Sequence, residues 1–120
     1  KNFFLHHENK NHIKLVNDIY FNPISIITLL TYIDLIIKYP KYGIYNIGSK
    51  SGLSKLDFGL NLAKKFNLDK KYINKVNSKQ LDFYAKRPKI MLTDTSKFEK
   101  NYNVRMPKLV DEIKSLTDEY

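Results

Sequence analysis

Residues 43–51, Gly-Ile-Tyr-Asn-Ile-Gly-Ser-Lys-Ser, come closest in this sequence to a phosphate-binding loop. That loop cradles phosphates with backbone amides and requires a lysine directly after its second glycine. Here Ser49 stands at that place, and a strand-like run lies between the two glycines. We therefore reject a phosphate-binding loop in this segment.

The sequence also lacks the residues that a metal site or a catalytic nucleophile would need. His6, His7 and His12 have no helical i, i+4 pair, and the chain contains no cysteine to complete a zinc site. No Gly-x-Ser-x-Gly elbow is present for acyl transfer. The acidic pairs at 111–112 and 118–119 fall on a predicted terminal helix and its tail, where carboxylates are normally solvated. We expect no metal site and no general acid or base.

Hydride transfer with a nicotinamide cofactor needs a glycine-rich turn, so that backbone can approach the pyrophosphate. In the short-chain type it also needs a tyrosine with a lysine one helical turn later. None of the nine tyrosines is followed four residues later by lysine; Tyr45, for example, is followed by Ser49. We therefore assign no catalytic and no cofactor-binding residue, and we expect this chain to bind no cofactor by itself.

The composition is that of one globular domain spanning residues 1–120, with 42% hydrophobic and 28% charged residues. The net charge is +9, but the basic residues are 19 lysines and only two arginines, spread along the chain. This spread favours a solvated basic face over a nucleic-acid partner. No apolar run is long enough for a membrane span, and no signal peptide is present. With no cysteine either, we expect a cytoplasmic protein.

Short β-branched runs alternate with helical patterns, which is typical of an α/β fold. Residues 13–16 are predicted as a strand, and apolar spacing predicts a helix over 25–39. Two residues could cap the start of this helix, and the sequence does not decide between them. Asn22 could cap it with Pro23 at the first helical position, or Ser25 could cap it.

A second strand is predicted at 44–47, followed by the best-marked helix of the sequence. Ser54 is placed to cap that helix, and Asp57 stands three residues later in a variant of the capping box. The apolar face of the helix continues to about residue 68.

The last third of the chain repeats the alternation. Strands are predicted at 73–76 and 89–92. Ser96 with Glu99 predicts a capping box and a brief helix, and Pro107 opens a final helix. The expected fold has short parallel strands with packing helices.

Three stretches carry a resemblance to a known family. They are residues 16–25 (Val-Asn-Asp-Ile-Tyr-Phe-Asn-Pro-Ile-Ser), residues 43–49 followed by 53–58, and residues 85–98, which contain Ala-Lys-Arg-Pro and Leu-Thr-Asp-Thr-Ser-Lys-Phe. In this order and spacing they resemble the C-terminal, substrate-side portion of the dTDP-4-dehydrorhamnose reductase family, of the extended short-chain dehydrogenase/reductase type. The resemblance covers nearly the whole chain from about residue 13.

The resemblance implies the substrate-binding portion of an enzyme that reduces the 4-keto group of a nucleotide sugar with NADP or NAD. The cofactor would bind to a Rossmann domain upstream of Lys1, in the full-length parent. The chain begins without Met, which agrees with part of a longer protein. The implied partner is the nucleotide-sugar substrate, held together with the upstream domain, and a homo-oligomer is a further expectation.

The resemblance also suggests which residues meet the substrate. Arg87 lies in a predicted loop, where its planar fork could make a bidentate pair with phosphate oxygens. Tyr20 and Asn22 follow a predicted strand, at the end where α/β sheets collect ligands. The alternatives are that Arg87 ties its loop to a carboxylate or a helix end, that Asn22 stabilises a turn, and that Tyr20 is partly buried.

Other functions remain open at this stage. The same portion occurs in related sugar-nucleotide epimerases and dehydratases, and the chain could be a non-catalytic binding or regulatory module. A basic RNA-associated domain is a third and weaker hypothesis, because it would rest on charge alone.

Overall fold

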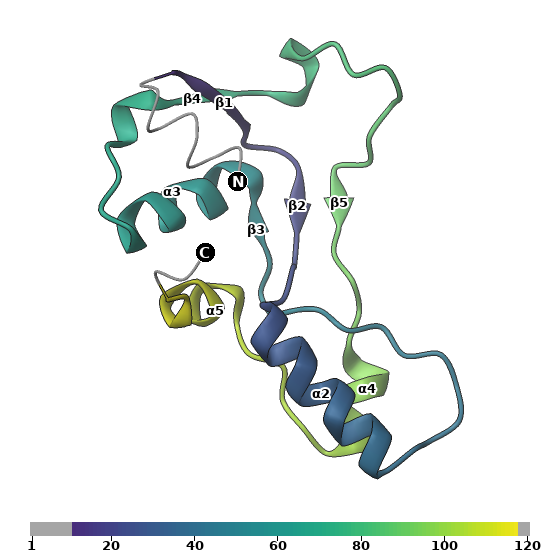
Figure 1. The fold of residues 1–120 in the computed structure, drawn as a ribbon. Helices are drawn as coiled ribbons and strands as arrows, with labels where there is room; N and C mark the ends of the chain where they lie inside the picture. The colour runs from purple at the N-terminus through teal and green to yellow at the C-terminus, as the bar shows by residue number, and fades with distance from the viewer. Residues whose placement is uncertain (1–10, 118–120) are drawn as a thin grey trace. The chain divides into compact units, whose positions relative to one another are not determined.

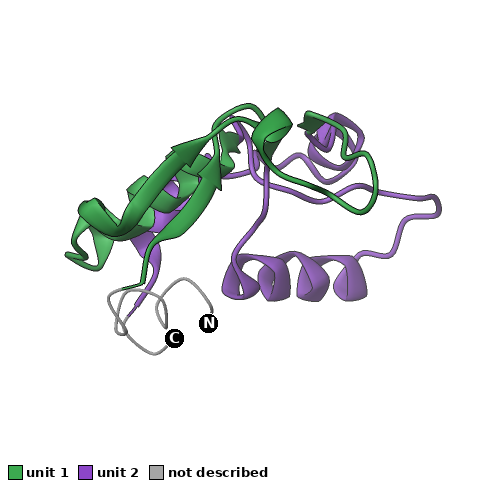
Figure 2. Cartoon of the chain, turned by 90° about the horizontal axis from the view of Figure 1, so that it is seen from above, with its two compact units in different colours: residues 1–21, 53–91, 118–120 green, residues 22–52, 92–117 purple. Residues whose placement is uncertain are grey.

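The computed structural model describes residues 11–117, which form two compact units (Figure 2). Unit 1 comprises residues 11–21 and 53–91, and unit 2 comprises residues 22–52 and 92–117. The described chain therefore passes from unit 1 into unit 2, returns to unit 1, and then enters unit 2 a second time. Each unit is described by itself.

Unit 1 contains two small sheets, labelled in Figure 1. Strand β1 (Ile13–Val16) pairs in parallel with β4 (Ile73–Val76), and Ile13 lies opposite Ile73. In the second sheet, β2 (Tyr20–Phe21) is central, antiparallel to β3 (Leu53–Ser54) and parallel to β5 (Ile90–Met91). Both parallel pairs bring together segments more than 55 residues apart in the chain.

Helix α3 (Lys55–Lys65) covers the first sheet of unit 1, and its buried residues include Leu62 and Ala63. Its start is the predicted cap, because Ser54 Oγ accepts from the Asp57 amide at 3.0 Å. The same hydroxyl donates to Asp57 Oδ2 at 2.8 Å, so the carboxylate reaches the cap's side chain and not its amide. Two short 3-10 turns, η1 (Lys70–Tyr72) and η2 (Ser78–Gln80), flank β4.

Unit 2 is helical. It contains α2 (Ile26–Lys38), α4 (Ser96–Tyr102) and α5 (Leu109–Ser115). The centre of its core is aromatic, with Phe98 completely buried beside Tyr102 and Met106. The partly buried side chains packed around this centre come from α2 and from the loops, and are Ile24, Tyr32, Leu35, Ile36, Tyr45, Ile47 and Val104.

Helix α2 begins at the second of the two predicted caps. Ser25 Oγ accepts from the Thr28 amide at 3.2 Å, and Thr28 Oγ1 donates to the carboxylate of Glu112 at 3.0 Å. Glu112 is buried, so this bond partners a carboxylate oxygen that water does not reach. A carboxylate at a helix N-terminus also complements the helix dipole.

The predicted strand at 44–47 does not form. Exposure does alternate as expected, since Tyr45 and Ile47 are partly buried against the unit 2 core while Ile44 and Asn46 are exposed. No neighbouring strand lies beside this segment within the described chain, and the Ile44 carbonyl accepts from the Lys97 ammonium instead. The alternation was correct, but a strand also needs a partner.

The predicted capping box at Ser96 and Glu99 is wrong in its cap. Residue Thr95 is the N-cap, and Ser96 is already helical. Glu99 accepts from Thr95 Oγ1 at 3.0 Å and from the Met106 amide at 3.1 Å, so its carboxylate ties α4 to the segment that follows it. The prediction paired Glu99 with Ser96, whereas the structure pairs it with Thr95 and Met106.

The α/β class and the positions of β1, α2, α3, β4, α4 and α5 agree with the sequence prediction. The two-residue strands β2 and β3 were not expected, since both lie in segments that are turn-like in sequence. No helix within residues 11–117 is both long and apolar enough to cross a lipid bilayer.

Candidate functional site

Arg87 lies in the loop of unit 1 that connects η2 to β5. The residue is exposed, and its guanidinium stands over the ring of Phe83 at 5.1 Å from the centroid. Among residues 11–117 it forms no ion pair and no hydrogen bond, so the carboxylate partner of the alternative hypothesis is not found there. The planar fork of its donors is therefore available to an anion.

Lys55, the first residue of α3, is the functional candidate that sequence reasoning missed. Its ammonium lies over the ring of Phe21 at 3.4 Å from the centroid. Phe21 in turn packs edge-on against Phe58, with centroids 5.1 Å apart. Burial lowers the pKa of Lys55, and the positive charge of Arg87 lowers it further. Nothing in the sequence marks this lysine among 19, because only the fold brings residues 21, 55 and 87 together.

The loop that carries Arg87 is anchored at both ends by one carboxylate, Asp18. Its oxygens accept from the Ser78 amide at 2.9 Å and from Ser78 Oγ at 2.6 Å. The Lys89 ammonium lies 3.3 Å from Oδ2. The hydrogen bond from the Ser78 hydroxyl is the largest cause that lowers the pKa of Asp18, and Lys89 adds to it. Asp18 is therefore held in its ionised form, and as a carboxylate it positions the loop that carries Arg87.

Tyr20 lies in β2, beside that loop. Its amide donates to the Lys89 carbonyl at 2.8 Å, and its strand partners are Ser54 and Ile90. The side chain is 38% exposed. Because successive side chains of a strand point to opposite faces, Tyr20 and Phe21 lie on different faces of the small sheet. The backbone of Tyr20 is thus next to the Arg87 loop, while its ring lies on the face opposite Phe21.

Asn22 belongs to unit 2, where it joins three segments. Its Nδ2 donates to the Ser49 and Thr93 carbonyls, both at 2.9 Å, and its Oδ1 accepts from the Thr93 amide at 2.8 Å. A Cβ atom at Gly48 would lie 2.8 Å from the Asn22 carbonyl oxygen, so glycine is required there. All polar atoms of the Asn22 side chain are thus engaged by backbone, and a direct contact with substrate stays a prediction.

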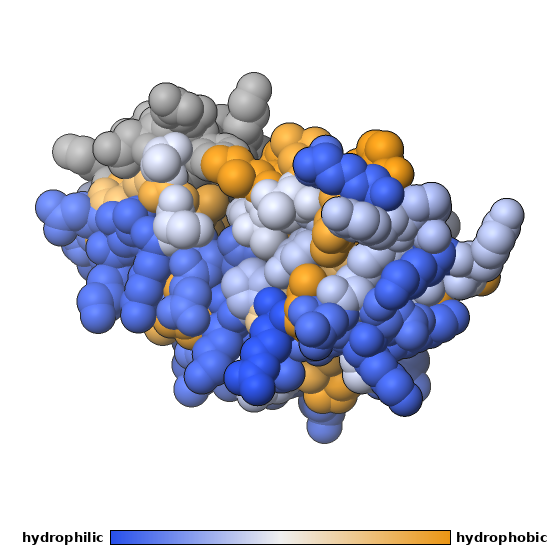
Figure 3. All heavy atoms as spheres, turned by 90° about the horizontal axis from the view of Figure 1, so that it is seen from below, coloured by the Kyte–Doolittle hydropathy of each residue, from blue (hydrophilic) through white to orange (hydrophobic). Residues whose placement is uncertain are grey.

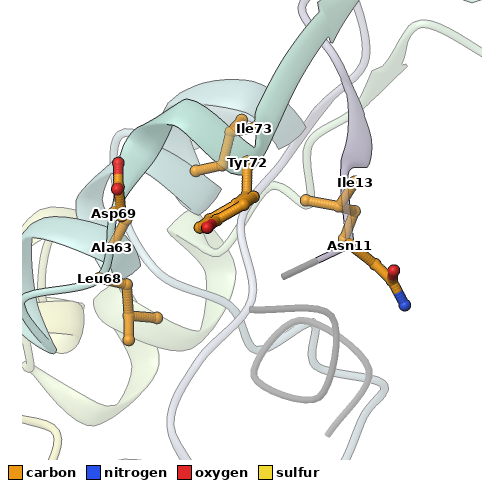
Figure 4. Close-up of a pocket in the computed structure, with 7 residues that line it drawn as sticks. All are labelled: Asn11, Ile13, Ala63, Leu68, Asp69, Tyr72 and Ile73. Carbon is orange, nitrogen blue, oxygen red and sulfur yellow. The ribbon is translucent and has the colours of Figure 1, made fainter. Parts of the chain in front are cut away.

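Two hollows among the described residues differ in size and polarity. The one in unit 1 holds about 10 Å³, roughly a single water, and is lined as drawn in Figure 4 by Asn11, Ile13, Ala63, Leu68, Asp69, Tyr72 and Ile73. The one in unit 2 is an open depression of about 440 Å³, lined by Lys50, Ser96, Glu99, Lys100, Asn103, Val104 and Arg105. Neither hollow includes a predicted site residue.

The surface view of Figure 3 shows hydrophilic side chains over most of one face, interrupted by apolar ones. Residues 11–117 hold no group of three metal-binding side chains. His12 contacts Asn74 Oδ1 at 3.2 Å and the edge of Tyr72, whereas His6 and His7 lie outside the described residues.

Unit 1 thus combines parallel strand pairs and a covering helix with two cations held on aromatic rings beside an anchored loop. The model of the family described as the RmlD substrate binding domain matches residues 1–120, and the chain belongs to that family.

Solved structures share the fold at low sequence identity. The dTDP-4-dehydrorhamnose reductase of Bacillus anthracis, in complex with NADP, matches with a TM-score of 0.82 and 19% identity over 94% of this chain and 39% of its own. The Clostridium acetobutylicum dTDP-4-dehydrorhamnose reductase matches with a TM-score of 0.83 and 19% identity over 94% and 40%. The dTDP-glucose 4,6-dehydratase of Bacillus anthracis, in complex with NAD, has a TM-score of 0.71 and 10% identity over 94% and 35%.

The chain thus spans about two fifths of the length of the reductases it matches. A search of curated proteins found no match. The resemblance inferred from the three sequence stretches is confirmed by the family match, and the expected fold by the structural matches.

Proposed function

We propose that this chain is the nucleotide-sugar-binding portion of an NAD(P)-dependent enzyme similar to dTDP-4-dehydrorhamnose reductase. The family match over residues 1–120 is the observation that carries the proposal. In the full-length enzyme, hydride would pass from NADPH or NADH to the 4-keto group of the sugar. The chain's own part is to hold the substrate, and the cytoplasmic location expected from the cysteine-free sequence belongs to the same proposal.

Arg87 is the residue we propose as the principal diphosphate ligand. It is exposed on an anchored loop, and among the described residues no carboxylate neutralises it. A guanidinium in this state can donate two parallel hydrogen bonds to phosphate oxygens. Tyr20 and Asn22 are also proposed as substrate-binding residues, each within its own unit: Tyr20 through its partly exposed ring, and Asn22 through the turn it holds together.

The cofactor does not fit the residues of this chain. A dinucleotide-binding turn needs glycines that let backbone approach a pyrophosphate. Gly48 faces the Asn22 carbonyl oxygen instead, and Gly59 is buried inside α3. We therefore propose that the cofactor is held by another part of the full-length protein.

The comparisons favour a reductase over a dehydratase. The two reductases have TM-scores of 0.82 and 0.83 with 19% identity, against 0.71 and 10% for the dehydratase. The enzyme WbmH of Bordetella bronchiseptica, in complex with NAD+, has a TM-score of 0.69 with 10% identity. These differences support, for this chain, the reductase activity named for the first two enzymes.

The test is Arg87→Ala in the full-length protein that carries this chain. Affinity for a deoxythymidine-diphosphate sugar should fall roughly ten- to a hundredfold, because one charge-assisted pair is worth about 1.5–3 kcal/mol. NADPH affinity should not change. Lys86→Ala is the matched control, since it removes a neighbouring positive charge from the same loop. Unchanged sugar-nucleotide affinity in Arg87→Ala would return Arg87 to a structural role.

A further inference from the structure

Lys55 is held in a setting that is unfavourable for an isolated cation. Its ammonium lies 3.4 Å from the centroid of the Phe21 ring, on an aromatic pair formed with Phe58. The ring face attracts the charge, but it replaces only part of the hydration that the ammonium loses. This desolvation is the larger cause that lowers the pKa of Lys55.

A second cation makes this setting still less favourable. Ser54 and Ile90 are the strand partners of Tyr20 on the two sides of β2, which places Lys55 and the loop of Arg87 beside the same strand. Arg87 stands over another ring, Phe83, and its charge lowers the pKa of Lys55. Like charges beside apolar surface repel each other more strongly than in bulk water. The fold thus brings together two cations from segments 32 residues apart, both backed by phenylalanine.

Two other cations of unit 1 are paired with carboxylates. Lys89 is paired with Asp18 at 3.3 Å, and Lys71 with Asp69 at 3.0 Å. For Lys55 and Arg87, no carboxylate lies within ion-pair distance among residues 11–117. The nearest acid in sequence, Asp57, accepts from Ser54 at the helix cap. An anionic ligand would therefore supply a counter-charge that no described carboxylate provides to these two cations.

We propose that Lys55 and Arg87 together form a two-cation site for a diphosphate group, with Lys55 as the second ligand of the nucleotide sugar. This inference rests on the proposed function and adds a residue to it. The bound diphosphate would neutralise both cations, and Arg87 would take two of its oxygens in a fork while Lys55 acts as a point charge.

The experiment measures the affinity of inorganic pyrophosphate and of deoxythymidine diphosphate by calorimetric titration. The variants are Lys55→Gln, Arg87→Gln and the double variant, all in the full-length protein. Each single variant should weaken both ligands on the order of tenfold. The double variant should lose less than the product of the two losses, because both cations serve one group. Lys55→Arg keeps the positive charge and should retain most of the affinity of the unsubstituted protein.

Two controls separate ligation from general charge and from packing. Lys64→Gln removes a charge from the other end of α3, and Lys86→Gln removes one beside Arg87; both should stay within about twofold of the unsubstituted protein. In the unsubstituted protein, pyrophosphate should shift the ring proton signals of Phe21 and Phe83 in NMR spectra. That readout needs no substitution, so it remains decisive if a variant fails to fold.

The outcomes distinguish this inference from the proposed function. If Arg87→Gln weakens binding while Lys55→Gln does not, the two-cation site is wrong and Arg87 keeps its role. If neither substitution weakens binding, both proposals fail. Unshifted Phe21 signals at saturating pyrophosphate, or no pyrophosphate binding at all, would also overturn the two-cation site.

Discussion

In unit 2, Lys97 and Lys41 lie over the rings of Tyr45 and Tyr102, each 5.1 Å from the ring centroid, and both also donate to backbone carbonyls. In unit 1, Lys55 and Arg87 lie on aromatic rings and have no described carboxylate partner. The two unit 2 lysines over rings thus also bond to the backbone, whereas Lys55 and Arg87 have no such partner among the described residues. A count of 21 basic residues could not separate these uses, because the difference lies in the partners.

The comparison also concerns aromatic side chains. In unit 2 the rings form the interior, where Phe98 contacts Tyr102 at 4.9 Å and Tyr32 at 5.3 Å between centroids. In unit 1 the rings of Phe21 and Phe83 back cations. We therefore expect substitutions in unit 2 to act on stability and substitutions in unit 1 to act on ligand affinity. The following predictions test that division, from the largest expected effect to the smallest.

The largest effect is expected for Phe98→Ala, which empties the centre of the unit 2 core. Phe98 is 0% exposed, and truncating a buried phenylalanine costs about 3–5 kcal/mol. Urea unfolding followed by circular dichroism measures the loss. Tyr42→Ala is the control, because Tyr42 is fully exposed, and it should change stability by about 0.5 kcal/mol or less. Equal effects of the two substitutions would contradict the assigned core.

Asn22→Ala should cost about 2–4 kcal/mol of stability, because it leaves one amide and two carbonyls of unit 2 without their partner. The measurement is again a urea unfolding curve, combined with sugar-nucleotide titration below the unfolding transition. Stability close to that of the unsubstituted protein, with lost affinity, would instead make Asn22 a direct substrate ligand. That result would contradict the expectation that substitutions in unit 2 act on stability and not on ligand affinity.

The outer face of α2 predicts self-association of the 120-residue chain. Its apolar side chains at helical spacing are strongly exposed, with Ile26 at 61%, Leu30 at 58% and Ile37 at 72%. Such a stripe favours burial against another protein surface. We expect sedimentation at tens of micromolar to show a dimer or larger species, and Leu30→Glu with Ile37→Glu to restore the monomer. A monomeric unsubstituted chain would contradict this.

The smallest effect is a pH dependence at Glu99. Burial alone would raise the pKa of Glu99, but hydrogen bonds from the Met106 amide and Thr95 and the charge of Lys50 outweigh it, so the pKa is lowered. A carboxyl with a lowered folded pKa contributes stability above its unfolded pKa. That contribution is lost as the pH falls through the folded pKa.

The measurement for Glu99 is the urea midpoint as a function of pH, from neutral pH to below pH 4. Glu99→Gln should flatten the acid side of the curve. Asp82→Asn is the control, since it removes an exposed carboxyl from unit 1. An unchanged acid slope in Glu99→Gln would mean that this carboxylate contributes nothing measurable.

Sequence reasoning placed the elements that depend on local chemistry. The Ser54 cap and the apolar spacing of α2 are local signals, because a helix satisfies its own backbone and needs only one apolar face. The failures are of the opposite kind. Residues 44–47 have a strand's alternation and no partner, whereas Tyr20–Phe21 looks like a turn and pairs on both sides. A strand depends on a neighbour that is distant in sequence.

The candidate site likewise depends on residues that are distant in sequence. The sequence alone determined the family, through motifs whose order and spacing are carried along the chain, and it singled out Arg87, one of only two arginines. Lys55 has no such signal, since its charge, helix position and neighbours in sequence are ordinary. Only the tertiary structure decided that its ammonium lies over Phe21 within reach of the charge of Arg87. Desolvation and charge repulsion act through space, and the chain order does not record which residues they will couple.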